Sequence, residues 1–416
     1  MRRIFKGPIA RSTVNTTGVL LLRLAFQVIT LLVVTRMLGS AQFGAYAAIA
    51  ALAILCGSLG TFGTHLILLG EASKDASTRG AILSYALPTT LIVGSILFIP
   101  YATLALLLIR HTGISVWVVL ALGVAELLLQ PLIVLATVEH QAHGRIARSQ
   151  LLIIMPLGLR MLAAVAVWRI GLNHALVAFA FAYLLAAGLG LAVAARTLPL
   201  AWPRMRDWRL ARLSELQQSA GYGVLALTAL APGELDKTLA MKLLPLHIAG
   251  VYAAGTRVIN ALTVPVMALL ISSTPRLFRE NAASAPRATR PSRLFPLLFS
   301  LALAYGLLAS ILLRETASLI ALAFGVGYRD LAQVLPWLAL AVPAVTLRIA
   351  AGAILVTQSR PWIRAGFEVS GIAVLAISAM ALAPGRPIAG MPLALACAEW
   401  MMAIVGWGLV WRGNQT

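Results

Sequence analysis

Apolar residues occur along this chain in long unbroken runs, which begin at Val14 and recur as far as Trp411. A helix needs about 18 or more such residues to cross a bilayer, and many of the runs reach that length. Membrane strands instead show alternating apolar and polar residues over segments of about 10 residues, a pattern that these runs do not follow. We therefore predict an all-α polytopic membrane protein.

The runs divide into twelve predicted transmembrane helices. They span residues 14–38, 42–69, 81–109, 114–138, 148–169, 173–195, 217–244, 248–273, 294–313, 331–357, 362–383 and 390–411. Residues 314–330 hold a short apolar stretch bracketed by charges, so we expect that stretch to lie in the membrane interface. The first run is longer than the core of a signal peptide, and no cleavage site of small residues follows it, so we expect it to be retained.

The composition agrees with this class of protein. The chain has 416 residues, of which 60% are hydrophobic and 11% charged, whereas soluble domains are about half apolar and about a quarter charged. The mean hydropathy is +0.92. Cys56 and Cys397 both fall within apolar runs and belong to no spaced set, which gives no support to a disulfide framework or a zinc site. We find no phosphate-binding loop and no catalytic triad, and we expect no metal, no cofactor and no enzymatic activity.

A net charge of +20 would suit a nucleic-acid-binding protein, but the distribution of the charge favours membrane topology instead. Outside the predicted spans, 19 lysines and arginines lie on the side that holds the N-terminus and 4 lie on the other side. Basic residues concentrate in the cytoplasmic loops of membrane proteins. We therefore predict that both termini are cytoplasmic and that nucleic acid is not a partner.

A faint internal repeat relates the two halves of the chain. Residues 36–48 align without gaps on residues 242–254, which places Gly44 on Gly250. Both stretches join the first and second predicted helices of their half. The repeat predicts two pseudo-symmetric six-helix lobes that are related by an axis along the membrane normal, as in transporters with parallel repeats.

These lobes give the predicted domain organisation. The N-terminal lobe covers residues 1–195 and the C-terminal lobe covers residues 218–416. Between them, residues 196–217 alternate tryptophan and leucine with arginine, a pattern that suits an amphipathic helix lying on anionic headgroups. A second basic loop, 274–295, is rich in proline, alanine and serine, and we expect it to be mobile.

Nine charged residues lie deep within the predicted spans, where a charge costs roughly 2.5–3.5 kcal/mol and usually faces a cavity or a partner. Five are basic, and we predict that they line a central cationic cavity between the lobes: Arg23, Arg160, Lys237, Arg257 and Arg348. A guanidinium binds phosphate oxygens in a bidentate fork, so such a cavity would suit a phosphate-bearing substrate. The acidic residues are candidates for proton or sodium coupling or for structural ion pairs: Glu126, Glu234, Asp236 and Glu399.

The densest of these charges follow Pro232-Gly233 in the seventh predicted span. Proline removes a helix hydrogen bond and glycine loosens the backbone, so we expect the helix to be broken there. Glu234 and Lys237 are three residues apart and therefore share a helix face on which they can pair. One carboxylate then remains to meet a cation elsewhere, and Arg257 on the next helix is the nearest by depth.

A histidine-rich stretch, "EHQAH" at residues 139–143, ends the fourth predicted span. It places His140 and His143 on one face beside Glu139, which makes a metal site the minor alternative. Because the stretch lies at the end of the span, we expect a solvated loop.

Four stretches resemble the bacterial polysaccharide exporters, the flippases for lipid-linked oligosaccharides of the MOP superfamily. They are "TRMLGSAQFGAYA" (35–47), "ELDKTLAMKLLPLHIAGVYAAGTRV" (234–258), "STPRLFRE" (273–280) and "FGVGYRDLAQVLPWLALAVP" (324–343). The positions that match the pattern around the seventh and eighth helices are Asp236, Lys237, Gly250 and Tyr252. Glu234, directly before Leu235-Asp236, departs from that pattern.

The resemblance implies a flippase in the bacterial inner membrane that moves an undecaprenyl-diphosphate-linked oligosaccharide to the periplasmic leaflet by alternating access. Its expected partners are this lipid substrate, membrane lipids, a polysaccharide polymerase and a chain-length regulator. A flippase for the peptidoglycan precursor and a MATE-like multidrug exporter are the alternatives from the same superfamily. A membrane-embedded polymerase or glycosyltransferase is less favoured, because the outer loops are too short to carry a catalytic site.

Overall fold

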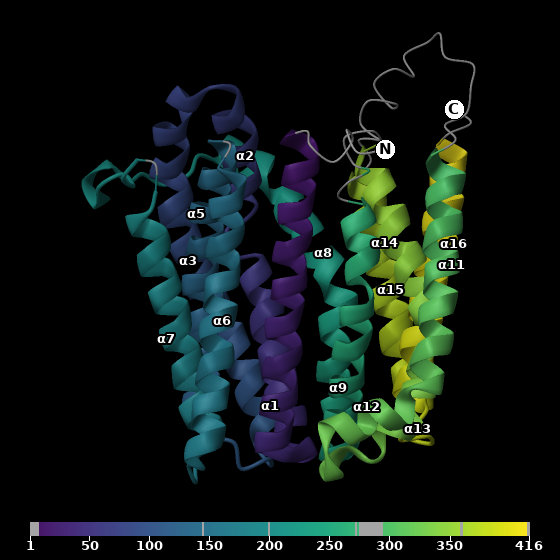
Figure 1. Ribbon diagram of the computed structural model, residues 1–416. Helices are drawn as coiled ribbons and strands as arrows, with labels where there is room; N and C mark the ends of the chain where they lie inside the picture. The colour runs from purple at the N-terminus through teal and green to yellow at the C-terminus, as the bar shows by residue number, and fades with distance from the viewer. Residues whose placement is uncertain are drawn as a thin grey trace. The chain divides into compact units, whose positions relative to one another are not determined.

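Every described part of the computed structural model with regular structure is helical (Figure 1). The structure describes residues 8–143, 145–198, 200–270, 273, 294–357 and 361–413. Residues 274–293 of the predicted mobile loop, which include residues 274–280 of the third stretch that resembles the exporters, lie outside these residues. Nine described helices are long and apolar enough to cross a membrane, or ten if the bent pair α13 and α14 is counted as one span. The all-α polytopic fold is therefore confirmed.

The helices follow the predicted spans closely. Their bounds are α1 (Pro8–Ser58), α2 (Thr64–Lys74), α3 (Arg79–Ile109), α4 (Val116–Gly123), α5 (Gln130–Ala142), α6 (Ile146–Ile170), α7 (Ala175–Arg196), α8 (Leu213–Leu243), α9 (Leu246–Leu262), α11 (Leu294–Glu315), α12 (Ala317–Phe324), α13 (Leu331–Ala339), α14 (Val342–Thr357), α15 (Pro361–Leu382) and α16 (Gly390–Gly413). Short helical turns are η2 (Ala76–Thr78), η3 (Val124–Leu129), η4 (Met205–Asp207) and η5 (Val326–Tyr328).

The chain packs into two compact units. The first contains residues 1–38 and 49–227, and in it α6 packs on α7 and α5, while α2 packs on α5. The second contains residues 39–48 and 228–416, and in it α14 packs between α11 and α16, while α13 packs on α9. Because these units are defined by packing and the predicted lobes by sequence order, the lobe boundaries stay a prediction.

Helix α1 joins the first two predicted spans across a kink at Gly39, where φ is 70° and ψ is 170°. A positive φ favours glycine, because a side chain would clash with the backbone there. The second span then ends at Ser58 and resumes as α2 after a turn in which Gly63 has φ of 78°. A Cβ at Gly63 would overlap the backbone of α8 at Ser219, so this turn and the start of α8 are in direct backbone contact.

The predicted break at Pro232-Gly233 is wrong, because α8 continues through both residues from Leu213 to Leu243. The helix contains the proline without a break. The broken span is instead the tenth, where α13 and α14 meet at an angle of 47°. A bend at this point leaves backbone carbonyls without a helical partner, and side chains on neighbouring helices bond them, as described below.

The segment between α7 and α8, residues 197–212, does not form the predicted amphipathic helix. Apart from the three-residue turn η4, its described residues have no regular structure. Proline at 203 lacks an amide hydrogen and disfavours helix geometry in the preceding residue, and the two tryptophans turn inward. We call this segment the linker strap.

The two halves of the internal repeat contact each other within the second unit. A Cβ at Gly44 would lie 2.6 Å from the amide nitrogen of Gly250, and a Cβ at Gly250 would overlap the carbonyl oxygen of Ser40. The backbones of α1 and α9 therefore touch at the residue pair that the repeat aligned. Only glycine allows this approach, which explains why both copies of the stretch contain it.

Candidate functional site

The deep charges gather in three separate clusters, each formed by helices of one unit. The first cluster, in the first unit, consists of Glu126 on the π-helical turn η3, Arg160 on α6 and Tyr183 on α7. The Arg160 guanidinium lies 3.4 Å from a Glu126 carboxylate oxygen, to which the Tyr183 hydroxyl donates a hydrogen bond. The guanidinium also stacks over the Tyr183 ring at 3.5 Å from its centroid. The charge of Glu126 is therefore met from two helices at once.

The backbone of η3 places this carboxylate. A π turn contains one extra residue per turn and occurs often at functional sites, since it redirects the side chains that it carries. Gly57 on α1 lies so close that a Cβ there would overlap the carbonyl oxygen of Glu126. Arg160 Nε is buried and has no hydrogen-bond partner among the described residues, so the guanidinium keeps an unused donor.

The second cluster, in the second unit, explains the charges that follow Pro232-Gly233. Lys237 Nζ lies 3.1 Å from Glu234 Oε2 and 3.5 Å from Asp236 Oδ1, and it also donates to the carbonyl oxygen of Gly233. From α9, the hydroxyl of Tyr252 donates to Asp236 Oδ2 at 3.0 Å, and Arg257 lies 3.8 Å from Glu234 Oε1. The predicted pairing of Glu234 with Lys237 is confirmed. Arg257 lies against that same carboxylate, whereas Asp236, the carboxylate expected to be left over, contacts Lys237 and Tyr252.

The third cluster joins three helices of the second unit. Arg348 on α14 donates to Glu399 on α16 at 2.5 Å, and its guanidinium lies 4.0 Å from Glu368 on α15. Arg364, one helical turn before Glu368, donates to the same carboxylate at 3.0 Å. The Glu368 side chain is buried against these two arginines.

The structure places the five predicted cavity cations in different surroundings. Arg160, Lys237 and Arg348 are each held in a buried ion pair within one unit, rather than standing open to a substrate. The acids could not be found by spacing along one helix, because they come from other helices. Arg23 on α1 is exposed and has no ion pair among the described residues. Arg257 keeps 31% of its side chain exposed. The predicted central cavity itself stays a prediction.

Sequence reasoning gave several members of these clusters no role in holding the deep charges. Tyr183 and Tyr252 both bond a deep carboxylate through their hydroxyl groups, and Arg364 completes the third cluster. A tyrosine in an apolar run carries little signal, because its ring packs in ordinary cores and its hydroxyl usually finds a hydrogen-bond partner there. Arg364 stands at the start of its predicted span, 362–383, and was not counted among the deep charges.

The histidine-rich stretch is not a solvated loop. Glu139 and His140 are fully buried in the last turns of α5. Glu139 accepts hydrogen bonds from Arg79 at the start of α3 and, at 3.1 Å, from Trp202 of the linker strap. The stretch therefore fixes the ends of two helices and the strap together.

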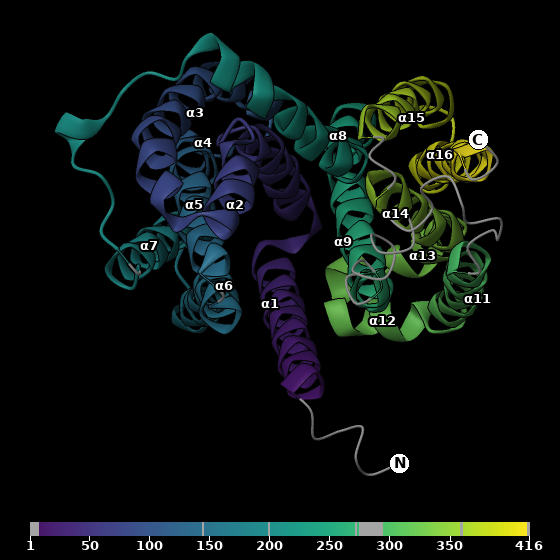
Figure 2. The same ribbon diagram turned by 90° about the horizontal axis from the view of Figure 1, so that it is seen from above.

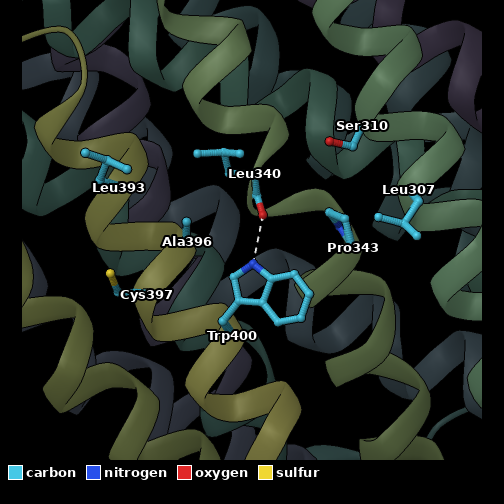
Figure 3. Close-up of a pocket in the computed structure, with 8 residues that line it drawn as sticks. All are labelled: Leu307, Ser310, Leu340, Pro343, Leu393, Ala396, Cys397 and Trp400. Atoms are coloured by element: carbon cyan, nitrogen blue, oxygen red, sulfur yellow. Dashed lines mark hydrogen bonds between the residues drawn. The ribbon is translucent and has the colours of Figure 1, made fainter.

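An apolar recess lies at the bend between α13 and α14 (Figure 3). Its volume is about 430 Å³, and it is lined by Leu307, Ser310, Leu340, Pro343, Leu393, Ala396, Cys397 and Trp400. Trp400 donates to the carbonyl oxygen of Leu340 at 3.0 Å, and Ser310 donates to that of Ala339 at 2.6 Å. These bonds satisfy the carbonyls that the bend exposes. The recess carries no charge and takes no part in the ion clusters.

The solved structures to which this chain is similar include transporters. A multidrug resistance MATE family transporter of the MOP superfamily in an inward-facing conformation has a TM-score of 0.72 at 14% identity, with 94% of each chain covered. An outward-facing conformation of such a transporter has a TM-score of 0.69 at 13% identity, covering 100% of this chain and 98% of the other. A MOP superfamily transporter from Pyrococcus furiosus, in which a binding pocket of reversed polarity suggests a different function, has a TM-score of 0.72 at 12% identity, covering 99% and 97%.

No family model matches the sequence, and no curated protein matches it. At these identities the structural likeness defines the fold alone. The chain has the fold of the MOP superfamily transporters, which agrees with the superfamily that the sequence motifs resemble.

Proposed function

We propose that this protein is a membrane transporter that moves an anionic amphiphile across the bilayer by alternating access. The substrate that we infer is a polyprenyl-diphosphate-linked oligosaccharide, carried from the cytoplasmic to the periplasmic leaflet of a bacterial inner membrane. In this proposal the diphosphate and the sugars contact the protein while the polyprenyl tail stays in the lipid. A polysaccharide polymerase and a chain-length regulator are the proposed partners.

One observation supports an anionic rather than a cationic substrate. In every arginine–carboxylate pair described above, the guanidinium is the more exposed member, as in Arg257 and Glu234 with 31% and 9% of their side chains exposed. Each deep carboxylate among the described residues is neutralised by a basic group of its own unit. A bare acid that would attract a cationic drug is thus lacking there, whereas arginine presents donors suited to phosphate oxygens.

The fold supports the mode of transport but not the substrate. Structures with this fold include inward-facing and outward-facing transporters, which is why alternating access is the mechanism that we infer. The binding pocket of the Pyrococcus furiosus protein differs in polarity within the same fold, so pocket charge varies among proteins of this architecture. A MATE-like exporter of cationic drugs remains the second candidate, because the fold is shared with it.

The test uses purified protein in proteoliposomes that contain a fluorescent polyprenyl-diphosphate sugar lipid. A membrane-impermeant quencher reports the lipid that reaches the outer leaflet. We expect translocation by the parent chain, and a loss of roughly 10-fold or more in initial rate for Arg257→Gln, because a charged hydrogen bond contributes about 1.5–3 kcal/mol. Arg169→Gln, at an exposed helix end away from the clusters, is the matched control and should keep the parent rate.

A second arm separates the two candidate functions. The same vesicles are loaded with a cationic dye, and its proton- or sodium-driven movement is followed. Transport of the dye but not of the diphosphate lipid would overturn the proposal in favour of a drug exporter. The translocation assay is then repeated with a peptidoglycan-type lipid in place of the oligosaccharide lipid, and the two rates show which glycan the protein prefers.

A further inference from the structure

The linker strap, residues 197–212, has an inner side that is fixed to the first unit. Arg79 donates to the carbonyl oxygens of Leu200 at 2.7 Å and Ala201 at 3.3 Å, and Trp202 donates to Glu139. Trp202 and Trp208 both pack against the apolar cluster formed by α2, α3 and α5. The strap is therefore held in one place by hydrogen bonds and by aromatic packing.

A second set of contacts fixes the end of the strap. The amide of Arg209 donates to the carbonyl oxygen of Ser84 at 3.0 Å, and its guanidinium lies 4.8 Å from the centre of the Tyr85 ring. Arg209 also makes two hydrogen bonds to Glu215, at 2.8 and 2.6 Å. The Arg209 guanidinium is therefore bound within the protein. Glu215 also accepts a hydrogen bond from the backbone amide of Arg212 at 2.7 Å, which caps the start of α8.

The outer side of the strap is basic and apolar at once. Its exposed apolar side chains are Leu200, Met205, Leu210 and, at the start of α8, Leu213, and Met205 is 77% exposed. Between them stand three exposed arginines: Arg204, Arg206 and Arg212. Asp207 is the single acid of the strap. Apolar side chains that alternate with guanidinium groups fit the boundary between headgroups and acyl chains, where each type finds its preferred surroundings.

The position of the strap in the first unit agrees with such a boundary. It leaves the end of α7, projects sideways beyond the helices of its own unit with η4 at its outer edge, and returns to the start of α8 (Figures 1 and 2). Its contacts are with the first turns of α3 and the last turns of α5, which lie at the end of the bundle that the charge count predicts to be cytoplasmic. A segment that projects sideways from that end would meet the headgroup region of the bilayer.

We propose that the outer side of the linker strap is a binding site for anionic phospholipids of the surrounding bilayer. The arginines bind phosphate groups, while Met205 and Leu210 enter the upper part of the acyl region. A free phosphate would satisfy the arginines but would leave the apolar side chains in water, so the lipid is the favoured source of the phosphate. The strap would then tie the first unit to the membrane surface independently of any transported substrate.

The experiment measures lipid binding by the full chain. Detergent-purified protein is titrated with phosphatidylglycerol or phosphatidylcholine, and bound lipids are counted by native mass spectrometry. We expect preferential retention of phosphatidylglycerol by the parent. The triple variant R204Q/R206Q/R212Q should lose that preference, with a weakening of about fivefold for each arginine near the anionic surface. Met205→Ser should weaken the binding of both lipids, because it removes the apolar contact.

A matched variant removes the same charge elsewhere. R110Q/R169Q/R386Q changes three exposed arginines at or near helix ends that the charge count predicts to be periplasmic, and this variant should bind phosphatidylglycerol as the parent does. Equal loss in both triple variants, or no loss in the strap variant, would overturn the site. Displacement of the lipid by millimolar inorganic phosphate would overturn the lipid as its ligand. Circular dichroism confirms that each variant is folded.

Discussion

At the scale of single residues, the deep charges are stabilised by partners that satisfy specific atoms. Lys237 is fully buried, and its ammonium group reaches two carboxylates and a backbone carbonyl. Burying an ion costs several kcal/mol unless its attractions and hydrogen bonds repay the desolvation, so these groups persist only as complete clusters. Each cluster includes a group from another helix, which makes the ion pairs a means of positioning helices as well as of holding charge.

Two buried tyrosines of the second unit allow a sharp test at this scale. Tyr252 donates to Asp236, whereas the Tyr328 hydroxyl is buried without a partner among the described residues. We expect Tyr252→Phe to destabilise the protein by about 1–3 kcal/mol, because it leaves a buried carboxylate oxygen unsatisfied. Tyr328→Phe should be neutral or stabilising. Thermal unfolding in detergent measures both, and equal destabilisation by the two variants would contradict the assignment.

At the scale of elements, glycine determines how closely helices approach. The close approach of Gly44 and Gly250 joins α1 to α9, and Gly57 allows α1 to reach the backbone of η3. The bend between α13 and α14 is stabilised differently, by Ser310 and Trp400, which bond the carbonyl oxygens that the break exposes. Close backbone contact and side-chain capping are thus the two devices by which these helices pack.

The first prediction for elements concerns Gly250. Gly250→Ala places a methyl group on the carbonyl oxygen of Ser40, which the backbone of α1 cannot easily avoid. Overpacking of this kind costs about 1–3 kcal/mol. We expect a lower unfolding temperature and a lower yield of folded protein in detergent. Gly366→Ala on α15 is the matched control, because a Cβ there meets no atom within 4 Å. A Gly250→Ala variant as stable as this control would refute the contact.

The second prediction concerns the linker strap and pH. The hydrogen bonds from Arg209 lower the pKa of Glu215 from 4.5 to about 2, so the folded state binds its proton more weakly than the unfolded state does. The stabilisation from this carboxylate is therefore complete above pH 4.5 and is lost as the pH falls toward 2. Glu215→Gln should lower the unfolding temperature at pH 7, and this difference from the parent should shrink across that range. A difference that is independent of pH would show that the ion pair contributes nothing.

At the scale of the whole molecule, the basic residues define a predicted topology that the helical fold leaves open. The helices specify which segments cross the membrane, but orientation depends on where the loop charges reside after insertion. The excess of basic residues on the side of the N-terminus predicts that both ends of the chain are cytoplasmic. The linker strap would then face the cytoplasmic leaflet, and the turns at Gly113 and Gly171 would face the periplasm.

Reporter fusions test this topology. A fluorescent protein that folds only in the cytoplasm should be bright after the C-terminal residue and dark after Gly113 or Gly385. Alkaline phosphatase, which is active only in the periplasm, should show the opposite pattern at the same three positions. Periplasmic activity at the C-terminus would reverse the predicted orientation and, with it, the direction of the proposed transport.

The sequence by itself determined the class of protein and the extent of its helices, because a backbone in lipid must satisfy its own hydrogen bonds and an apolar run therefore becomes a helix. It also identified the pair that lies within one helix, Glu234 with Lys237. It named Arg257 as a cation at matching depth, but the structure decided that Arg257 lies against Glu234. The internal repeat also aligned Gly44 with Gly250, the two glycines at which the backbones of α1 and α9 are in contact.

Only the tertiary structure decided which charges are neutralised. Arg160 meets Glu126 across 34 positions of sequence and Arg348 meets Glu399 across 51, and no spacing rule joins residues on different helices. It also decided that α8 passes through Pro232 unbroken while the tenth span bends, and that the linker strap folds back on α3 and α5 instead of forming a helix. These outcomes depend on contacts between elements, and such contacts exist only once the helices have packed.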